Sequence, residues 1–484
     1  MVSEEKNLPD SFVPGQKGTQ GEGIDLATTK NVKWVARLGD FACGTPAVAG
    51  GKVFVGAMIN QKGVLNCFDE ATGKLLWQWI KPCRTDIKEP PGQFAFNWIP
   101  KDLGVCSTPA VEGDRLYFVD QNCVVVCLDV NGRPPAPGAS VGEAREIWSF
   151  DMYGNKSVGS RPSDAANGSP ILDGDFLYVP TSNGVDRRNT VALDIDSPRQ
   201  CFAPDAPNLI VLDKRTGRLL AKDAAPIAAN MLHGQWSSPS MGVVNGQKLV
   251  FFGGGDGTCY AFHALASAPK QPVTLKTAWS VDCIPPEYRR FTGMAMFVHY
   301  CLGDRRRPDS LNTNDGTFKG MSEIVGTPVF YNNRVYVALG RDPEHGRGRG
   351  ALVCADATQS GDVTKTGKIW SYQDLDRTLS TVAIADGLLY IADVAGRLHC
   401  LDATSGEVQW VYETRNRAVS SPLVADGKVY MVSDRYVHIL AAGKTLRALS
   451  KTNLGAYSWV TPVAANGTVY IASKNYLWAL FGNH

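Results

Sequence analysis

The stretch TVAIADGLLYIADVAGRLHCLDATSGEVQW, residues 381–410, contains one structural repeat of this chain. A short strand comes first, followed by a Gly turn and an alternating strand with a central aromatic residue. A third strand then ends at Asp402, and after a Ser-Gly turn a last strand ends at Trp410. Alternation with period two, interrupted by turn residues, is typical of β-strands joined by hairpins. The stretch therefore predicts four antiparallel strands.

The same pattern recurs along the chain in one frame. The first strands begin with Ser or Thr, usually before Pro, at Thr45, Thr108, Ser169, Ser238, Thr327, Thr381, Ser421 and Thr461. The aromatic residue of the second strand recurs as Phe54, Tyr117, Tyr178, Phe251, Tyr336, Tyr390, Tyr430 and Tyr470. The outer tryptophan recurs as Trp77, Trp148, Trp279, Trp370 and Trp410, with Ala221 and Arg447 in its place in the third and seventh units. Repeated four-stranded units predict an all-β fold, an eight-bladed β-propeller, because radial closure protects sheet edges.

The two ends of the chain are expected to complete each other. The last repeat has only three strands, whereas residues 31–38 resemble an outer strand without a unit of its own. We therefore expect strand 31–38 to pair with the C-terminal blade and close the ring. Residues 1–30 are predicted to be an extended leader, and residues 31–484 a single propeller.

Large insertions are expected on one face of this propeller. In a four-stranded meander, the loop between the second and third strands emerges on the same face as the link to the next blade. Long loops on a rigid scaffold usually carry binding functions, so we assign function to this decorated face. Its insertions are residues 80–106, 153–167, 182–207, 283–323 and 340–350.

Composition excludes several classes of protein. The formal net charge is +2 with 20% charged residues, so no basic excess favours nucleic acid. No apolar run is long enough to form a transmembrane helix. The polar, Gly- and Pro-containing start lacks a signal peptide but is typical of a mature exported protein, which predicts a periplasmic or secreted location.

The repeated Asp and Thr-Gly of the turns, such as Asp69, Thr72 and Gly73, are interpreted as structural. Asp accepts hydrogen bonds from nearby amides in tight turns, and Gly supplies a positive φ. The glycine run at 251–257 spans a strand and its turn, so it lacks the context of a phosphate-binding loop.

One position of the repeat is expected to form a ring at the mouth of the central channel. It lies two residues before each first-strand start and is occupied by Cys43, Cys106, Asn167, Trp236, Val325, Leu379, Val419 and Trp459. Tryptophan offers a flat stacking surface for a sugar or an aromatic ligand. Trp236 and His233, in the octapeptide HGQWSSPS, are therefore the strongest pocket candidates, although His233 is equally well explained as a loop support.

The cysteines have several interpretations. Cys43 and Cys106 occupy equivalent positions in adjacent blades, so packed thiols, a disulfide and a metal site completed by His233 all remain open. Cys283 and Cys301 flank one insertion and are candidates for a staple. Four cysteines fall at one position of the third strand and are expected to be core thiols: Cys67, Cys127, Cys354 and Cys400.

Further site candidates lie in the insertions. His233, His299 and Arg341 are predicted to be catalytic. Arginine clusters receive carboxylates or sulfates through paired hydrogen bonds, but they are often only solvated surface charges. The predicted substrate-binding residues are Trp236, Trp459, Asn167, Trp98, Arg289, Arg290 and His345, and the predicted metal ligands are Cys43, Cys106 and His233.

The repeat phrases LDATSGEVQW, FDEATGKLLWQW and LDKRTGRLL resemble the pyrroloquinoline-quinone-like repeat of eight-bladed quinoprotein dehydrogenases over residues 31–484. The resemblance extends to uncharacterised exported bacterial propellers and to the non-enzymatic lipoprotein of the outer-membrane barrel-assembly machinery. For the dehydrogenases it implies pyrroloquinoline quinone with calcium and an adjacent cysteine pair, which this sequence lacks. A transition metal such as copper is the other cofactor candidate.

Three functions are consistent with these features. The first is an exported oxidoreductase, or another cofactor- or metal-assisted enzyme, acting on a sugar, polyol or similar polar molecule. The second is a carbohydrate-binding protein without catalysis. The third is a scaffold of the barrel-assembly type with a protein partner. The long loops and the His and Trp expected at the channel mouth favour a pocket over a scaffold, and of the three functions we favour the first.

Overall fold

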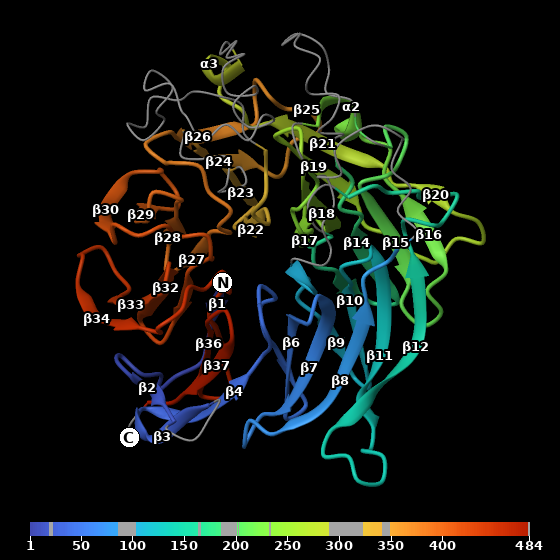
Figure 1. The fold of residues 1–484 in the computed structure, drawn as a ribbon. Helices are drawn as coiled ribbons and strands as arrows, with labels where there is room; N and C mark the ends of the chain where they lie inside the picture. The colour runs from blue at the N-terminus through green and yellow to red at the C-terminus, as the bar shows by residue number, and fades with distance from the viewer. Residues whose placement is uncertain are drawn as a thin grey trace, which may run out of the picture.

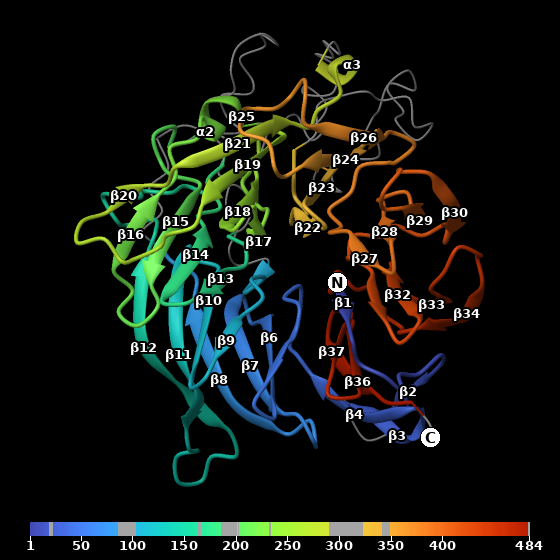
Figure 2. The same ribbon diagram turned by 180° about the vertical axis from the view of Figure 1, so that it is seen from behind.

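The protein is an all-β chain whose sheets radiate around a common axis like the blades of a propeller (Figures 1 and 2). The computed structural model describes residues 1–18, 23–85, 103–162, 166–184, 201, 203–231, 234–289, 323–340 and 349–482. Within these ranges the helices are short, namely α2 (Ile227–Asn230) and α3 (Pro286–Arg289). No helix of this part of the chain is long and apolar enough to cross a membrane.

The strands form antiparallel meanders, each named here after its first strand. The bounds are β5 (Ala47–Ala49), β6 (Lys52–Ile59), β7 (Lys62–Asp69) and β8 (Leu75–Pro82); β9 (Ala110–Glu112), β10 (Arg115–Val119), β11 (Val124–Arg133) and β12 (Gly142–Asp151); β13 (Ile171–Asp173), β14 (Phe176–Pro180), β15 (Leu209–Asp213) and β16 (Leu219–Lys222); β17 (Ser240–Val244), β18 (Gln247–Gly253), β19 (Thr258–His263) and β21 (Thr277–Asp282). They continue with β22 (Val329–Tyr331), β23 (Arg334–Leu339), β24 (Ala351–Asp356) and β26 (Lys368–Tyr372); β27 (Ala383–Ala385), β28 (Leu388–Ala392), β29 (Arg397–Asp402) and β30 (Val408–Glu413); β31 (Leu423–Ala425), β32 (Lys428–Ser433), β33 (Tyr436–Ala441) and β34 (Ala448–Asn453); and β35 (Val463–Ala465), β36 (Thr468–Ala472) and β37 (Tyr476–Leu480).

The hydrophobic core lies between neighbouring meanders. Strand β28 is buried along its whole length because its two faces pack against different neighbours. Leu389 packs in one cluster with Leu352 of the preceding β22 meander, whereas Leu388 packs with Val429 of the following β31 meander. The second strands therefore appear in the sequence as nearly continuous apolar runs.

In most meanders the outer tryptophan contacts the turn of the next one, and five of these indoles donate a hydrogen bond there, namely those of Trp34, Trp77, Trp148, Trp279 and Trp410. The indole Nε1 of Trp77 donates to the carbonyl of Val130 at 3.1 Å, and that of Trp148 donates to Lys214 at 3.1 Å. The same turn also explains the repeated glycine, since a Cβ on Gly217 would lie 2.7 Å from the Trp148 ring. The structural interpretation of the Asp and Thr-Gly turns is thus supported: Asp69 Oδ1 accepts from the backbone N–H and the hydroxyl of Thr72.

The second-strand aromatic residue packs against the tryptophan of its own meander. Ring centroids lie 5.9 Å apart in Phe54 and Trp77, and also 5.9 Å apart in Tyr117 and Trp148. Two repeated residues that are far apart in the sequence therefore form one aromatic pair in each unit that has the tryptophan.

Two meanders lack the tryptophan, and other segments replace it. In the β13 meander, Ala221 faces Val211, and Tyr178 Oη accepts a hydrogen bond from the backbone N–H of Leu265 in the insertion after β19. In the β31 meander the sequence-based alignment was wrong, because the register places Ser450 opposite Ile439. The turn before β34 contains extra residues, so Arg447 precedes the position that corresponds to the tryptophan, and Ser450 occupies it.

The leader covers this β31 meander. Ser450 Oγ donates to the carbonyl of Asp10, and Tyr430 Oη donates to the carbonyl of Pro9 at 2.6 Å. Leu8 and Phe12 are buried in the cluster between the β31 and β35 meanders. The first residues continue inward as β1 (Val2–Ser3), which pairs in parallel with β31 near the centre of the ring (Figure 1).

The ring closes as expected from the sequence. Strand β4 (Val32–Arg37) pairs antiparallel with β37, placing Trp34 opposite Ala479. Trp34 then donates to the carbonyl of Glu70 at 2.9 Å, so it joins the last meander to the first.

Several strands lie outside the meanders. They are the hairpin of β2 (Val13–Lys17) and β3 (Ile24–Lys30), and the outer strands β20 (Val273–Thr274) and β25 (Gly361–Asp362).

The Ser and Thr residues that start the first strands have a role that the sequence did not reveal. The backbone N–H of Thr327 donates to Thr381 Oγ1 at 2.9 Å, and that of Thr381 donates to Ser421 Oγ at 2.9 Å. Hydrogen bonds of the same kind join Thr108 to Ser169, Ser169 to Ser238, and Ser421 to Thr461. These bonds run from blade to blade near the inner edges of the sheets.

We expect Gly73→Ala to destabilise the protein more than Gly387→Ala does. Both glycines have a positive φ, +71° and +73°, so each substitution costs about 1–2 kcal/mol in backbone energy. A Cβ on Gly73 would also lie 2.5 Å from the Trp34 ring, whereas nothing lies within 4 Å of one on Gly387. Displacing Trp34 adds roughly 1–3 kcal/mol. Urea denaturation measures the difference, and equal losses in the two variants would contradict the role of this contact.

Candidate functional site

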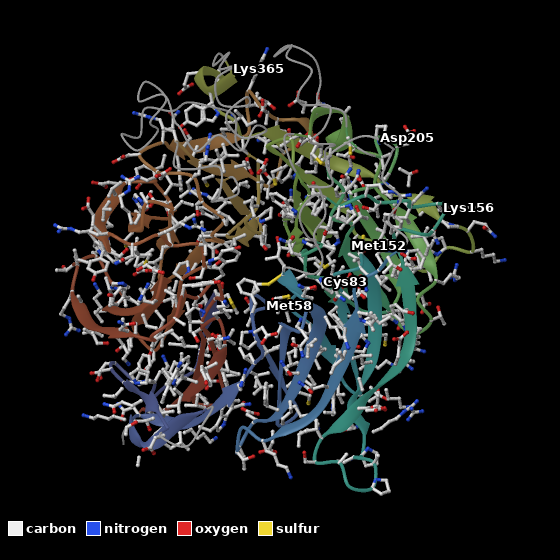
Figure 3. All side chains as sticks on the ribbon, in the orientation of Figure 1. Met58, Cys83, Met152, Lys156, Asp205 and Lys365 are labelled. Carbon is white, nitrogen blue, oxygen red and sulfur yellow. A yellow bond between two sulfur atoms is a disulfide. The ribbon has the colours of Figure 1, made fainter. Side chains whose placement is uncertain are left out.

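Two of the residues predicted to line the mouth of the ring form a disulfide. Cys43 and Cys106 are bonded, with Cα atoms 5.1 Å apart, and both are half-buried. Figure 3 shows the yellow S–S bond near the middle of the molecule. Of the three states left open by the sequence, the structure contains the disulfide. Sulfurs in this state are not thiolate ligands, so the predicted metal site would require reduction of the bond.

An aromatic cluster lies next to the disulfide. It includes Phe41, two residues before Cys43, and Trp459, which holds the mouth position of the preceding repeat. The rings of Phe41 and Trp459 meet edge to face at 5.5 Å, and Tyr457 packs against Trp459 at 6.3 Å. Phe41 is buried, whereas Tyr457 is 37% exposed and Trp459 is half-buried. Lys474 Nζ lies 5.6 Å from the Tyr457 ring centroid. The cluster therefore presents aromatic surface together with one cation.

Trp236 and Asn167 occupy neighbouring mouth positions further along the ring. Trp236 is 7% exposed, and its ring lies so close to Gly234 that a Cβ there would be 2.6 Å from it. Asn167 is half-buried, and its Oδ1 is buried without a hydrogen-bond partner. The opposite part of the mouth is aliphatic, with half-buried Val325, Leu379 and Val419. Aromatic, cysteine and amide residues thus occupy consecutive members of the predicted mouth position, from Trp459 through Cys43, Cys106 and Asn167 to Trp236.

Most of the other predicted site residues lie outside the described part of the chain. These are His233, His299, Arg341, Trp98, Arg290 and His345. Arg289 is the last residue of α3. Their proposed roles remain predictions.

The remaining cysteines fit the core interpretation. Cys67, Cys127, Cys354 and Cys400 are buried free thiols, and burial raises the pKa of Cys67 to about 12. Cys283 is also a buried free thiol, so the staple considered for it is not formed in the structure; Cys301 lies outside the described residues.

The described residues fit neither the calcium that the family resemblance implies nor the copper considered as the other candidate. Calcium takes six to eight oxygen ligands, and copper takes imidazole or sulfur ligands. No group of three His, Cys, Asp or Glu side chains in the described ranges is placed to hold a metal ion. The single disulfide found there joins cysteines 63 residues apart rather than an adjacent pair.

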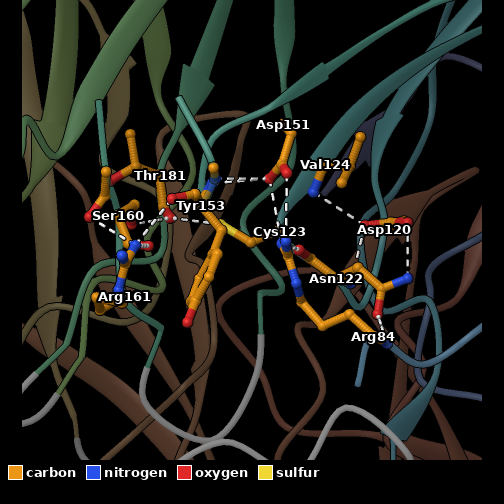
Figure 4. Close-up of polar contacts among 12 residues, drawn as sticks. Arg84, Asp120, Asn122, Cys123, Val124, Asp151, Tyr153, Ser160, Arg161 and Thr181 are labelled. Atoms are coloured by element: carbon orange, nitrogen blue, oxygen red, sulfur yellow. Dashed lines mark hydrogen bonds and ion pairs between the residues drawn. The ribbon is translucent and has the colours of Figure 1, made fainter. Parts of the chain in front are cut away.

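A polar cluster that the sequence analysis missed lies at the decorated ends of β8, β11 and β12 (Figure 4). Arg84 follows β8 and donates from Nη1 and Nη2 to the two carboxylate oxygens of Asp151, at 3.1 and 3.3 Å. The ring of Tyr153 lies between two guanidinium groups, with its centroid 4.1 Å from Cζ of Arg84 and 3.8 Å from Cζ of Arg161. Both arginines belong to insertions identified in the sequence, but nothing there indicated that they meet on one ring.

Asp120 forms the buried edge of this cluster. Its Oδ1 accepts from the backbone N–H groups of Asn122 and Val124 at 2.8 and 2.9 Å. Burial nevertheless raises the pKa of Asp120 to about 7, because desolvation outweighs these hydrogen bonds. Burial likewise raises the pKa of the neighbouring Cys123 thiol, whose Sγ donates to the carbonyl of Thr181.

Fold and mouth together define a propeller of the pyrroloquinoline-quinone-like class. A family model described as outer membrane protein assembly factor BamB matches residues 18–83, 34–279 and 361–474, and the chain belongs to this family. No curated relative matches the chain.

Solved structures support the fold. BamB from Moraxella catarrhalis is 15% identical, with a TM-score of 0.53 over 94% of this chain and 98% of that one. The computationally designed Ika8 protein is 10% identical, with a TM-score of 0.51 over 91% and 96%. A quinohemoprotein alcohol dehydrogenase from Pseudomonas putida HK5 is 14% identical, with a TM-score of 0.47 over 91% and 66%. At these identities the likeness concerns the fold alone.

We expect Asp120→Asn to change the pH dependence of stability. With a pKa near 4 in the unfolded chain and about 7 in the fold, wild-type Asp120 binds its proton more tightly when folded. Stability is therefore lost as the pH rises from 4 to 7, by up to about 4 kcal/mol. The asparagine variant does not ionise, so its stability relative to wild type should increase over this range.

Denaturation with urea between pH 4 and pH 8 measures this difference. Asp114→Asn is the matched control, because the Asp114 side chain is 81% exposed. A constant difference between Asp120→Asn and wild type would show that the carboxylate is charged in the fold throughout.

Proposed function

We propose that this protein binds a carbohydrate, or a similar polar small molecule, at the mouth of the ring on its decorated face. One observation carries the proposal: the mouth position holds Trp459, the disulfide, Asn167 and Trp236 on one side and only aliphatic residues on the other. Aromatic rings stack on the apolar faces of sugars, and an amide can bind hydroxyl groups. Such a mixed surface is typical of small-molecule sites.

An oxidoreductase would bind the same kind of molecule at the same place and would in addition oxidise or reduce it. Its catalytic groups would be His233, His299 and Arg341, outside the described residues. The described residues at the predicted mouth supply an aromatic ring and an amide, which are groups that bind a ligand, so binding is the function that we favour.

A scaffold function is the second candidate, and the family match favours it. The structure of BamB from Moraxella catarrhalis is covered over 98% of its length, and the matching family is described as an outer membrane protein assembly factor. A scaffold of this kind would bind a protein partner rather than a sugar.

We also propose that the ring has eight blades, formed by residues 31–484 with a leader at 1–30. The repeated first-strand starts and the pairing of β4 with β37 support this count. A periplasmic or secreted location is supported by the disulfide between Cys43 and Cys106, because disulfides persist in oxidising compartments.

Calorimetric titration with maltotriose, cellotriose and xylotriose tests the binding proposal. Trp459→Ala should weaken binding of the best ligand about 10-fold or more, because it removes the stacking surface of a half-buried indole, worth about 1–3 kcal/mol. Tyr331→Ala is the matched control, since this half-buried aromatic residue ends β22 on the opposite face. Absence of binding, or equal affinity in all variants, would contradict the proposal.

A further inference from the structure

Arg161 differs from Arg84, the other guanidinium on the Tyr153 ring, in how its charge is compensated. Arg84 is paired through two nitrogens with the Asp151 carboxylate. Arg161 is half-buried and forms no ion pair with any carboxylate of the described residues. A partly desolvated cation without a counter-charge carries an energetic cost that a bound anion would offset.

The hydrogen bonds of Arg161 fix its guanidinium by one edge. Nη1 donates to the carbonyls of Tyr153 at 2.9 Å, Gly159 at 3.1 Å and Ser160 at 3.0 Å. Tyr153 packs against the flat face at 3.8 Å. Within the described chain, Nε and Nη2 make no hydrogen bond, and these two groups form the fork that binds two oxygens of a carboxylate or sulfate.

Backbone contacts connect Arg161 to the mouth. The carbonyl of Arg161 accepts from the N–H of Gly184 at 2.9 Å, and Gly184 forms an antiparallel bridge with Gly234. Neighbouring strands lie about 4.8 Å apart, so the backbones of Arg161 and Gly234 are separated by about 10 Å. Gly234 contacts the ring of Trp236. The Trp236 ring itself is buried, so a ligand in this region would lie over the backbone at the Gly184–Gly234 bridge, and one of two or more sugar units can extend from there to Arg161.

We infer that Arg161 is a receptor for an anionic group of the ligand, which makes the substrate class an acidic saccharide bearing a carboxylate or sulfate. This inference rests on the proposed carbohydrate function and adds the charge of the ligand to it. Arg161 binds the anion through Nε and Nη2, while Tyr153 and the three carbonyls hold the guanidinium in place.

Titration with trigalacturonate, a sulfated trisaccharide and neutral cellotriose tests the inference. Wild-type protein should bind one of the two acidic ligands at least 10-fold more tightly than the neutral one, and the preferred ligand shows whether the group is carboxylate or sulfate. Arg161→Gln should lose this preference, with about 10- to 100-fold weaker acidic binding and unchanged neutral binding. Arg161→Lys, which retains the charge without the fork, should recover only part of it.

Arg145→Gln is the matched control, because it also removes one positive charge. The Arg145 side chain is 61% exposed, lies at the opposite end of β12 and pairs with Asp129. If Arg161→Gln and Arg145→Gln weakened acidic binding equally, the preference for acidic ligands would depend only on the net charge of the protein. That result would overturn the inference. Wild-type protein that binds neutral and acidic trisaccharides equally would overturn it as well, while leaving the binding function intact.

Malonate and inorganic sulfate separate the inference from the proposed function. If no saccharide binds, the carbohydrate function fails, but an anion site at Arg161 should still raise the thermal unfolding midpoint of wild type and Arg145→Gln. The Arg161→Gln variant should show no such rise. Equal stabilisation of all three proteins, or of none, would overturn the anion site.

Discussion

The contact between an outer tryptophan and the glycine turn of the next blade is the interaction on which the ring depends. It combines an indole hydrogen bond, as from Trp148 to the carbonyl of Lys214, with packing so close that Gly217 has no room for a Cβ. Each blade has two buried faces but cannot bury them alone. A repeated contact of fixed geometry therefore sets the angle between blades, and Trp34 applies it across the closing point.

Where this contact is missing, the chain supplies a substitute from elsewhere. Tyr178 accepts a hydrogen bond from Leu265 of an insertion, and Tyr430 donates one to Pro9 of the leader. The leader is thus packed against the ring, with Leu8 and Phe12 in a shared core. A position that loses its tryptophan leaves an apolar face uncovered, and burial of another segment there compensates for the loss.

The decorated face combines two chemically distinct regions on this rigid frame. The mouth contains Trp459, Trp236 and a disulfide, and the adjoining cluster contains two arginines on one tyrosine ring. The backbone of Gly184 connects these regions by bonding to Arg161 and pairing with Gly234. An aromatic surface beside a fixed cation matches a ligand with both sugar faces and a negative charge.

The sequence by itself determined the all-β repeat, the turn chemistry and the closing strand, because these depend on contacts that recur in every unit. It also identified Cys43, Cys106 and Trp236 as equivalent mouth positions, since equivalence follows from the frame alone. The sequence assigned Arg447 to the tryptophan position of the seventh unit. This was wrong, because the longer turn before β34 adds residues and the strand pairing places Ser450 at that position. Tertiary structure decided the disulfide and the meeting of Arg84, Tyr153 and Arg161. These residues come from links of irregular length, and only the packing of neighbouring blades fixes where such links meet.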